Sequence, residues 1–144
     1  MTLEKIIAIT GKPGLYKLEK QTRTGFLAKN IEDGKRITAT MRHEVSSLDR
    51  IAIYAYSEEV LLGHIFNTIH KKEAENDGKL TINPKKADNK ALATYFREIL
   101  PEFDEEQVYP SVIKKVLKWY TILENAKILP VEVVEENQEE ETEA

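Results

Sequence analysis

The first half of the chain alternates apolar and polar residues over short stretches that turn signals separate. A period of two is typical of β-strands. The stretches cover residues 5–9, 15–21, 26–32, 36–41 and 51–56. Pro13 and Gly14 fit the centre of a type II turn, and Asp33 with Gly34 suits a tight hairpin loop. About five short strands in so few residues usually curl until their edges meet. We therefore expect a small β-barrel, SH3-like or similar, in this half.

After residue 57 the apolar positions recur every three or four residues, the spacing that places them on one face of a helix. This spacing predicts a helix over residues 58–73. Ser57 is placed to act as its N-cap, and Glu58 and Glu59 would complement the positive end of its dipole.

Two further helices are predicted before residue 130. Asp88 or Asn89 caps the first, over about residues 89–100, and Pro101 ends it. The second covers about residues 112–126, where apolar residues again repeat at helical spacing.

The chain thus divides into four parts within an α+β fold class. They are a β-barrel-like domain with its following helix (1–73), a linker or long loop (74–87), a helical module (88–130) and an acidic tail (131–144). The tail has too few apolar residues to offset the conformational entropy that folding would remove, so we expect it to be disordered.

Charge is distributed unevenly along the chain. The net charge of the 144 residues is −4, yet residues 1–56 carry +4 and residues 130–144 carry −7. The acidic tail therefore hides a mildly basic body, well short of the pI above about 9 that is typical of nucleic-acid-binding domains. Such a tail is also able to compete with an anionic ligand for the basic half.

The composition excludes several classes of protein. Without cysteine the chain has no disulfide, no thiolate metal site and no Cys nucleophile. Its N-terminus lacks the apolar stretch of about 7–15 residues that marks a secretory signal. Apolar runs such as 51–55 and 60–62 are too short to span a bilayer. We expect a cytoplasmic protein with no membrane partner.

Three stretches of the chain carry a resemblance to known proteins. They are ITGKPGLYKL at residues 9–18, LDRIAIY at 48–54 and ILPEFDEEQVYPSVIKKVLKWYTIL at 99–123. These stretches resemble an uncharacterised domain-of-unknown-function family of short Bacteroidetes proteins, over about residues 3–125. The resemblance implies a bacterial cytosolic protein and brings no activity, cofactor or catalytic residue with it. Val112 departs from the family pattern, which has an acidic residue after Ser111, and this weakens the helix start slightly.

Basic residues gather on the predicted strands and turns, with Tyr16 and Phe26 between them. Small barrels bind nucleic acid with this combination, because cations contact phosphates and exposed rings stack on bases. The alternative is an ordinary charged sheet surface with Tyr16 in the core. The candidate nucleic-acid-binding residues are Lys12, Lys17, Arg23, Lys29, Arg36 and Arg42.

A second candidate cluster lies on the last predicted helix. Lys115 and Trp119 are four residues apart and share a helix face, so they are able to form a cation–π pair or to anchor a partner. With Lys118 they are the candidate partner-binding residues. The alternative is a tryptophan that packs against its own domain.

No catalytic or metal-binding constellation stands out. His64 and His70 are six residues apart, on different faces of their predicted helix, and His43 is distant in sequence. The helix dipole explains carboxylate pairs such as Glu58 with Glu59 without acid–base chemistry. We expect no metal, no cofactor and no enzyme.

These observations favour a non-enzymatic binding protein. The first hypothesis is a module that binds nucleic acid or belongs to a ribonucleoprotein, through the basic strands. The second is a protein–protein interaction adaptor that uses Trp119 or the 58–73 helix. A small-ligand binder or an enzyme is the third.

Overall fold

The computed structural model describes residues 3–11, 14–40 and 45–133. Lys12, Arg42 and His43 lie outside the described residues, as does most of the predicted disordered tail.

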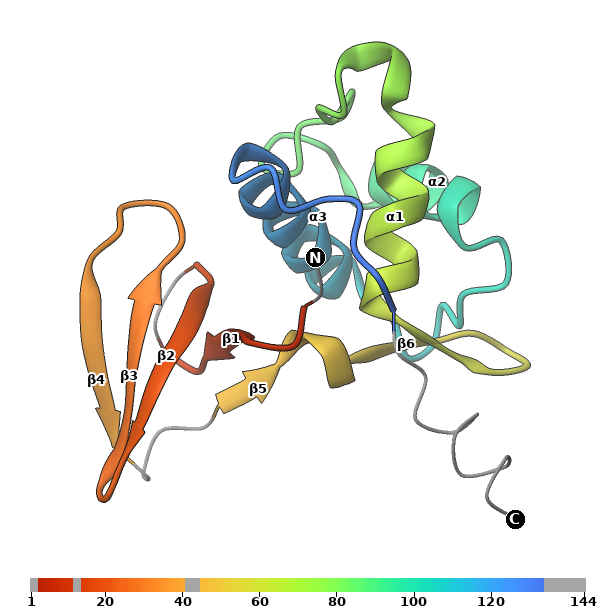
Figure 1. The fold of residues 1–144 in the computed structure, drawn as a ribbon. Coiled ribbons are helices and arrows are strands. Elements are labelled where there is room, and N and C mark those ends of the chain that lie inside the picture. The colour runs from red at the N-terminus through yellow and green to blue at the C-terminus, as the bar shows by residue number, and fades with distance from the viewer. Residues whose placement is uncertain (1–2, 12–13, 41–44, 134–144) are drawn as a thin grey trace.

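Five strands form an antiparallel sheet in the order β4-β3-β2-β1-β5 (Figure 1). The strands are β1 (Ile6–Ile9), β2 (Tyr16–Thr22), β3 (Gly25–Asn30), β4 (Arg36–Thr40) and β5 (Val45–Ser47). The first four confirm the strands that the alternating pattern predicted. Gly14 and Gly34 have φ angles of 86° and 75°, the left-handed conformation that glycine adopts easily. Gly34 lies in a connection of residues 31–35 between β3 and β4, which is longer than the tight loop predicted at Asp33 and Gly34.

After the sheet the chain forms a hairpin and three helices. The 3-10 helix η1 (Leu48–Arg50) leads into β6 (Ala52–Tyr54) and β7 (Glu59–Leu61), which pair with each other in a separate two-stranded sheet. The helices are α1 (Leu62–Lys72), α2 (Asn89–Ile99) and α3 (Pro110–Asn125), with the short 3-10 helix η2 (Ala74–Asn76) after α1.

The five-stranded sheet is open and does not close into the predicted barrel. Its two edge strands are β4 and β5, and no pairing joins them within the described part of the chain. One reason is that β5 has only three residues. The other is that the last predicted strand, over residues 51–56, leaves the sheet through η1 and pairs with β7. The prediction of an SH3-like barrel is therefore wrong, whereas the prediction of a mixed α+β fold class is confirmed.

The helix predicted over residues 58–73 begins only at Leu62, because the preceding residues form β7. Ser57 therefore does not cap it, and its Oγ lies 3.3 Å from Glu102 Oε2 instead. The N-cap of α1 is Leu61, which has no side-chain acceptor. Pairing with β6 has overridden the local helix signal of a serine followed by two acidic residues.

The other two helices match their predictions. Asp88 caps α2, where its Oδ1 accepts a hydrogen bond from the Ala91 amide at 2.8 Å. Pro110 is the first residue of α3, a position where the missing amide proton has no helical partner to lose.

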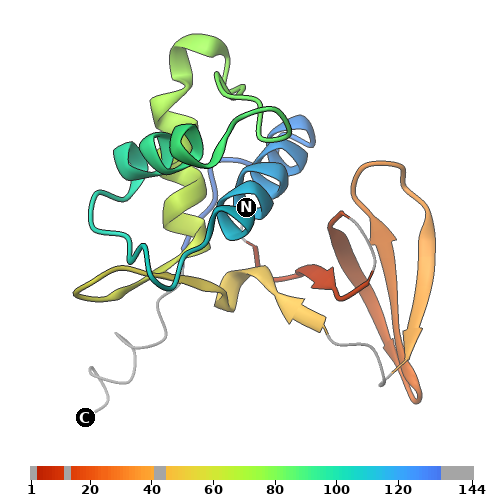
Figure 2. The same ribbon diagram turned by 180° about the vertical axis from the view of Figure 1, so that it is seen from behind.

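The main hydrophobic core lies between the three helices and the part of the sheet around β1 and the start of β2; Figure 2 shows how these elements are arranged. Phe66, Phe96 and Tyr120, one from each helix, are fully buried there. Ile6 from β1 and Leu15 from the turn before β2 belong to the same cluster. The first and second halves of the chain therefore share one core.

A second, smaller core lies on the opposite face of the sheet. Because successive side chains of a strand point to opposite faces, Ile6 enters the main core and Ile7 enters this one. Its buried members are Ile7, Ile9, Tyr16, Ala28 and Ala39.

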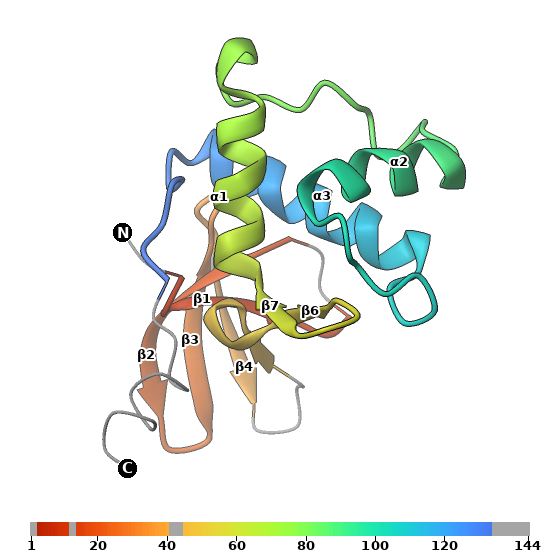
Figure 3. The same cartoon turned by 90° about the vertical axis from the view of Figure 1, so that its right-hand side faces the viewer.

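Residues 128–133 form an extended strap that runs back along α1 (Figure 3). The Asn67 side chain donates to the Val131 carbonyl at 2.7 Å and accepts from the Val131 amide at 2.8 Å. The Val131 side chain is 6% exposed and belongs to the main core. Gly63 leaves room for Val133, since a Cβ there would lie 2.6 Å from Val133 Cγ2.

Candidate functional site

Three of the predicted basic residues meet in one row across the sheet. Lys17 on β2 lies opposite Lys29 on β3, and Lys29 lies opposite Arg36 on β4. Residues directly opposite each other on antiparallel strands project to the same face. All three side chains are exposed. Since neighbouring strands are about 4.8 Å apart, the row is about 10 Å wide.

A β-bulge in β2 adds a fourth cation that the sequence pattern did not reveal. The pairing shifts between Leu18 and Lys20, so that Glu19 is the extra residue and Lys20 lies opposite Leu27. Leu27 and Lys29 are two residues apart on β3 and share a face, so Lys20 projects to the side of the basic row. Plain alternation along β2 would have placed it on the other face.

We call this surface the basic face. It has a net charge of +3, because it contains four cations and one carboxylate. The Arg36 Nε donates a hydrogen bond to this carboxylate, at Glu19 Oε1, over 2.7 Å. Its charged members are Lys17, Glu19, Lys20, Lys29 and Arg36.

The remaining predicted cations do not join the row. Arg23 lies in the turn between β2 and β3, six residues from Lys17 and therefore about 20 Å along the strand. Lys12 and Arg42 lie outside the described residues.

The aromatic residues predicted beside these cations point away from them. Tyr16 is 6% exposed in the second core, and Phe26 is half-buried against the same cluster. Tyr16 therefore lies in a core, as one of the two alternatives expected. The basic face presents cations without rings for base stacking.

On α3 the predicted pairing of Lys115 with Trp119 is present. The Lys115 Nζ lies 5.7 Å from the centroid of the Trp119 ring. Trp119 is half-buried and packs against the main core, while Lys118 is exposed. One side of the tryptophan thus packs against its own domain, and part of the ring stays accessible to solvent.

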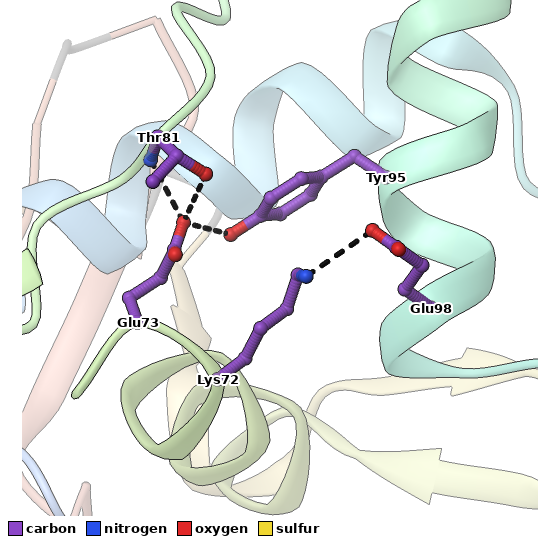
Figure 4. A network of polar contacts seen from close by, with 5 residues as sticks. All are labelled: Lys72, Glu73, Thr81, Tyr95 and Glu98. Carbon is purple, nitrogen blue, oxygen red and sulfur yellow. Dashed lines mark hydrogen bonds and ion pairs between the residues drawn. The ribbon is translucent and has the colours of Figure 1, made fainter. Parts of the chain in front are cut away.

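A buried carboxylate that sequence reasoning missed lies at the end of α1 (Figure 4). Glu73 is 4% exposed, and its Oε2 accepts hydrogen bonds from the Tyr95 hydroxyl at 2.7 Å and from the amide and hydroxyl of Thr81 at 2.8 Å each. Beside it the Lys72 Nζ lies 3.1 Å from Glu98 Oε2 and 5.2 Å from the centroid of the Tyr95 ring. A glutamate that follows two lysines gives no sequence signal of burial.

The surroundings of Glu73 shift the pKa values of three groups. Burial raises the pKa of the Glu73 carboxyl, but hydrogen bonds from Tyr95 and Thr81 and the charge of Lys72 together lower it below its usual value. Burial, and then the adjacent Glu73 carboxylate, raise the pKa of the Tyr95 phenol. Burial is also the main cause of the raised pKa of Tyr120. The carboxylate is therefore ionised and both phenols are protonated at neutral pH.

Two depressions flank the segment 79–84 that Glu73 holds in place. One, of about 450 Å³, lies against α3 and includes Tyr120 and Glu124. The other, of about 440 Å³, lies against α2 and includes Tyr95 and Glu98. Because all three donors converge on one Glu73 oxygen, the network is an anchor for this loop and leaves that oxygen no place for a substrate.

Within the described residues, no three His, Asp or Glu side chains lie close enough together to hold a metal ion. His64 and His70 both lie on α1, and the His70 ring packs beside Gly78. In the same part of the chain, no helix has both the length and the apolar character needed to cross a membrane.

Comparisons with known proteins give a family but no activity. Residues 3–48 match the model of a domain of unknown function, DUF5606, and residues 51–123 match a second one, DUF6852. A solution NMR structure of a protein from Bacteroides vulgatus is similar over 88% of this chain and 89% of that chain, with 40% sequence identity and a TM-score of 0.72. A search of curated proteins finds no match.

The junction of the two matched segments falls at η1, where the chain leaves the five-stranded sheet, and the likeness to the Bacteroides protein agrees with the resemblance drawn from the three sequence stretches. The chain belongs to the DUF6852 family of proteins with a domain of unknown function, and it carries a DUF5606 match before that domain.

Proposed function

We propose that the protein is a non-enzymatic module that binds nucleic acid, free or within a ribonucleoprotein, through the basic face. The observation that supports this proposal is the register of Lys17, Lys29 and Arg36 on three adjacent strands. Like charges directly opposite each other destabilise a sheet. An anion that binds across this exposed row reduces the repulsion within its two like-charged pairs. Unfavourable local arrangements of this kind are typical of functional surfaces.

The basic face suits phosphates better than bases. Lys and Arg side chains donate charge-assisted hydrogen bonds to phosphate oxygens. With its net charge of +3, the face is able to neutralise about three phosphates of a nucleic-acid backbone. Contacts of this kind position a protein on nucleic acid without reading its sequence. We therefore expect binding that depends weakly on sequence.

Salt dependence is the direct test of this proposal. Neutralisation of about three phosphates predicts a slope of log K against log salt of about −2 for a single strand and about −3 for a duplex. Affinity should then fall by about 20–40-fold between 50 and 200 mM salt. Fluorescence anisotropy of the full chain with a labelled single-stranded RNA and a labelled DNA duplex measures both slopes.

The double variant Lys17→Glu/Lys29→Glu tests whether binding uses this face. It reverses two charges of the row and should weaken binding at least tenfold. The matched control is Lys85→Glu/Lys86→Glu, which makes the same charge change at two exposed lysines outside the sheet. Equal losses in both variants, or no binding of the unmodified chain at 50 mM salt, would remove the proposal.

The acidic tail gives a further test of the same face. If it competes with nucleic acid, a chain that ends at Val133 should bind more tightly than the full chain, with the larger difference at low salt. This end point keeps the strap residue Val131 in the core. An unchanged affinity would show that the tail does not cover the basic face.

An adaptor function is the second candidate, because the Trp119 ring is partly accessible beside Lys115 and Lys118. The apolar side of α1, the other surface considered for this role, is buried in the main core. A protein partner retained after nuclease treatment, and lost in Trp119→Ser with an unchanged circular dichroism spectrum, would favour the adaptor. Loss of the same partner with nuclease would favour the nucleic-acid module.

A further inference from the structure

A second charged surface forms where β6 pairs with the segment that follows α2. Ala55 and Phe103 form an antiparallel bridge. The Tyr56 amide donates to the Glu102 carbonyl at 2.8 Å, and the Asp104 amide donates to the Tyr54 carbonyl at 2.9 Å. Residues 102–104 thus act as a third strand beside the β6–β7 hairpin.

This register sets tyrosines and carboxylates side by side on the outer face. Tyr54 lies opposite Glu59 on β7 and, one step from the bridge, opposite Asp104. By the same step Tyr56 lies opposite Glu102. We call these five residues the tyrosine face. Its two rings are 46% and 67% exposed, whereas the inward residues Ile53 and Phe103 belong to the main core.

The tyrosine face is negative, because three of its five residues are carboxylates. The two segments that contain it, residues 54–59 and 102–106, together hold six carboxylates and no Lys or Arg. Arg97 pairs with Glu105. In the part of the chain that the structure describes, no ion pair neutralises Glu58, Glu59 or Glu102.

The helix dipole does not account for these charges. The sequence predicts that Glu58 and Glu59 complement the positive end of a helix, but α1 begins at Leu62, after the hairpin. The carboxylates instead surround exposed rings on a sheet face that nothing covers within the described residues. Aromatic rings attract cations through their faces, and adjacent carboxylates strengthen that attraction.

We propose that the tyrosine face docks an extended, cationic segment of a protein partner, with Lys or Arg at alternate positions. Alternate side chains of an extended chain lie about 6.8 Å apart on one side. Tyr54, at the end of β6, and Tyr56, just after it, are likewise two residues apart on either side of the Ala55–Phe103 bridge. Each cation then lies over one ring and next to one carboxylate, Glu59 or Asp104 at the first position and Glu102 at the second. The hairpin that carries this surface lies at the opposite end of the molecule from β2, β3 and β4, which carry the basic face (Figures 1 and 2).

The test is binding of three labelled peptides to the full chain at 50 mM salt. The first alternates Lys and Thr over eight residues, the second has the same composition in two blocks, and the third alternates Glu and Thr. The alternating basic peptide should bind several times more tightly than the block peptide, and the acidic one should not bind. Equal affinity for both basic peptides would overturn the proposal, because it would show attraction to negative charge without register.

Variants locate the peptide on the surface. Tyr54→Ser/Tyr56→Ser removes both rings from exposed positions and should weaken binding by about tenfold. Glu59→Gln/Glu102→Gln should weaken it several-fold. The control Glu75→Gln/Glu132→Gln removes the same charge from exposed positions elsewhere and should leave binding within twofold.

Amide shifts separate this site from the acidic tail, which every variant keeps. Peptide addition should shift the amide signals of residues 54–59 and 102–104 in a ¹⁵N spectrum. Shifts confined to residues 134–144 would overturn the proposal. So would self-association at low salt that both a tyrosine-face variant and a basic-face variant abolish, because the occupant would then be a second copy of this chain.

Discussion

The basic face and the tyrosine face are both made by strands in register, yet they are attached to the fold differently. The basic face projects from three strands whose other side covers only the small second core. The tyrosine face is fastened to the main core by Phe103, which is 2% exposed and meets the Phe96 ring edge-on at 5.1 Å.

This difference teaches that charge and stability are distributed independently in this molecule. The tyrosine face, which lies over the larger main core, carries the carboxylates. The basic face, whose strands cover only the smaller second core, carries the cations. Damage to one support should therefore impair one kind of binding and spare the other. Two substitutions test this separation, and a third, under neither surface, is the comparison; they follow in order of the expected loss of stability.

The largest effect is expected for Phe103→Ala. Removal of a buried aromatic side chain typically costs about 3–5 kcal/mol of the free energy of unfolding, and here it also detaches the third strand of the tyrosine face. Urea unfolding measures the loss. In the fraction that stays folded, binding of the cationic peptide should fall while binding of RNA persists. Phe103→Leu is the milder control, and parallel loss of both activities would contradict the separation.

A smaller effect with the opposite pattern is expected for Gly25→Ala. A Cβ at Gly25 would lie 1.9 Å from the Ala39 carbonyl oxygen, so β3 and β4 must move apart. Overpacking of this kind costs about 1–3 kcal/mol. Amide exchange should accelerate in β3 and β4 but not in the helices, and RNA binding should weaken while peptide binding is kept. Thr24→Ala, in the same turn, should change neither.

The smallest effect is expected for Glu73→Gln, which lies under neither surface. Loss of the charge weakens the three hydrogen bonds that the carboxylate accepts and should cost about 1–2 kcal/mol at pH 7. The pKa of Glu73 is lower in the folded than in the unfolded chain. Its stabilising effect is therefore complete at pH values above the pKa of this glutamate in the unfolded chain, and it disappears as the pH falls through the lower pKa of the folded chain.

Thermal unfolding from pH 7 to pH 3 compares the two chains. The gap in melting temperature between the unmodified chain and Glu73→Gln should close toward the acidic end. A gap that stays constant with pH would mean that the charge of this carboxylate does not stabilise the fold. RNA and peptide binding should be unchanged in the variant at pH 7.

Local patterns predicted the elements of this fold better than their assembly. Strands β1 to β4, the Asp88 cap and the start of α3 near Pro110 all follow from period, turn and cap signals. The barrel was wrong because closure depends on which strands pair at a distance. The Ser57 signal failed for the same reason, since β7 is defined by its partner β6 and by nothing in its own three residues.

The candidate sites show the same limit. Periodicity found Lys17, Lys29 and Arg36 but could not align them, because register is set by turns and by burial of the opposite face. Periodicity also missed Lys20, because the bulge in β2 turns this side chain to the other face of the sheet. It also missed Tyr54 and Tyr56 as a surface, since their acidic neighbours Glu102 and Asp104 come from a segment that is distant in sequence.

The strap has a practical meaning for anyone who shortens this protein. The match to DUF6852 ends at residue 123, and an expression boundary chosen there would remove the partner of the Asn67 amide and open the main core where Val131 lies. The two polar atoms of the Asn67 amide would then lose their partners, and apolar residues of the core would become exposed, which favours aggregation. The smallest fragment worth purifying therefore runs past the recognised family boundary to Val133, and an affinity tag belongs beyond that residue.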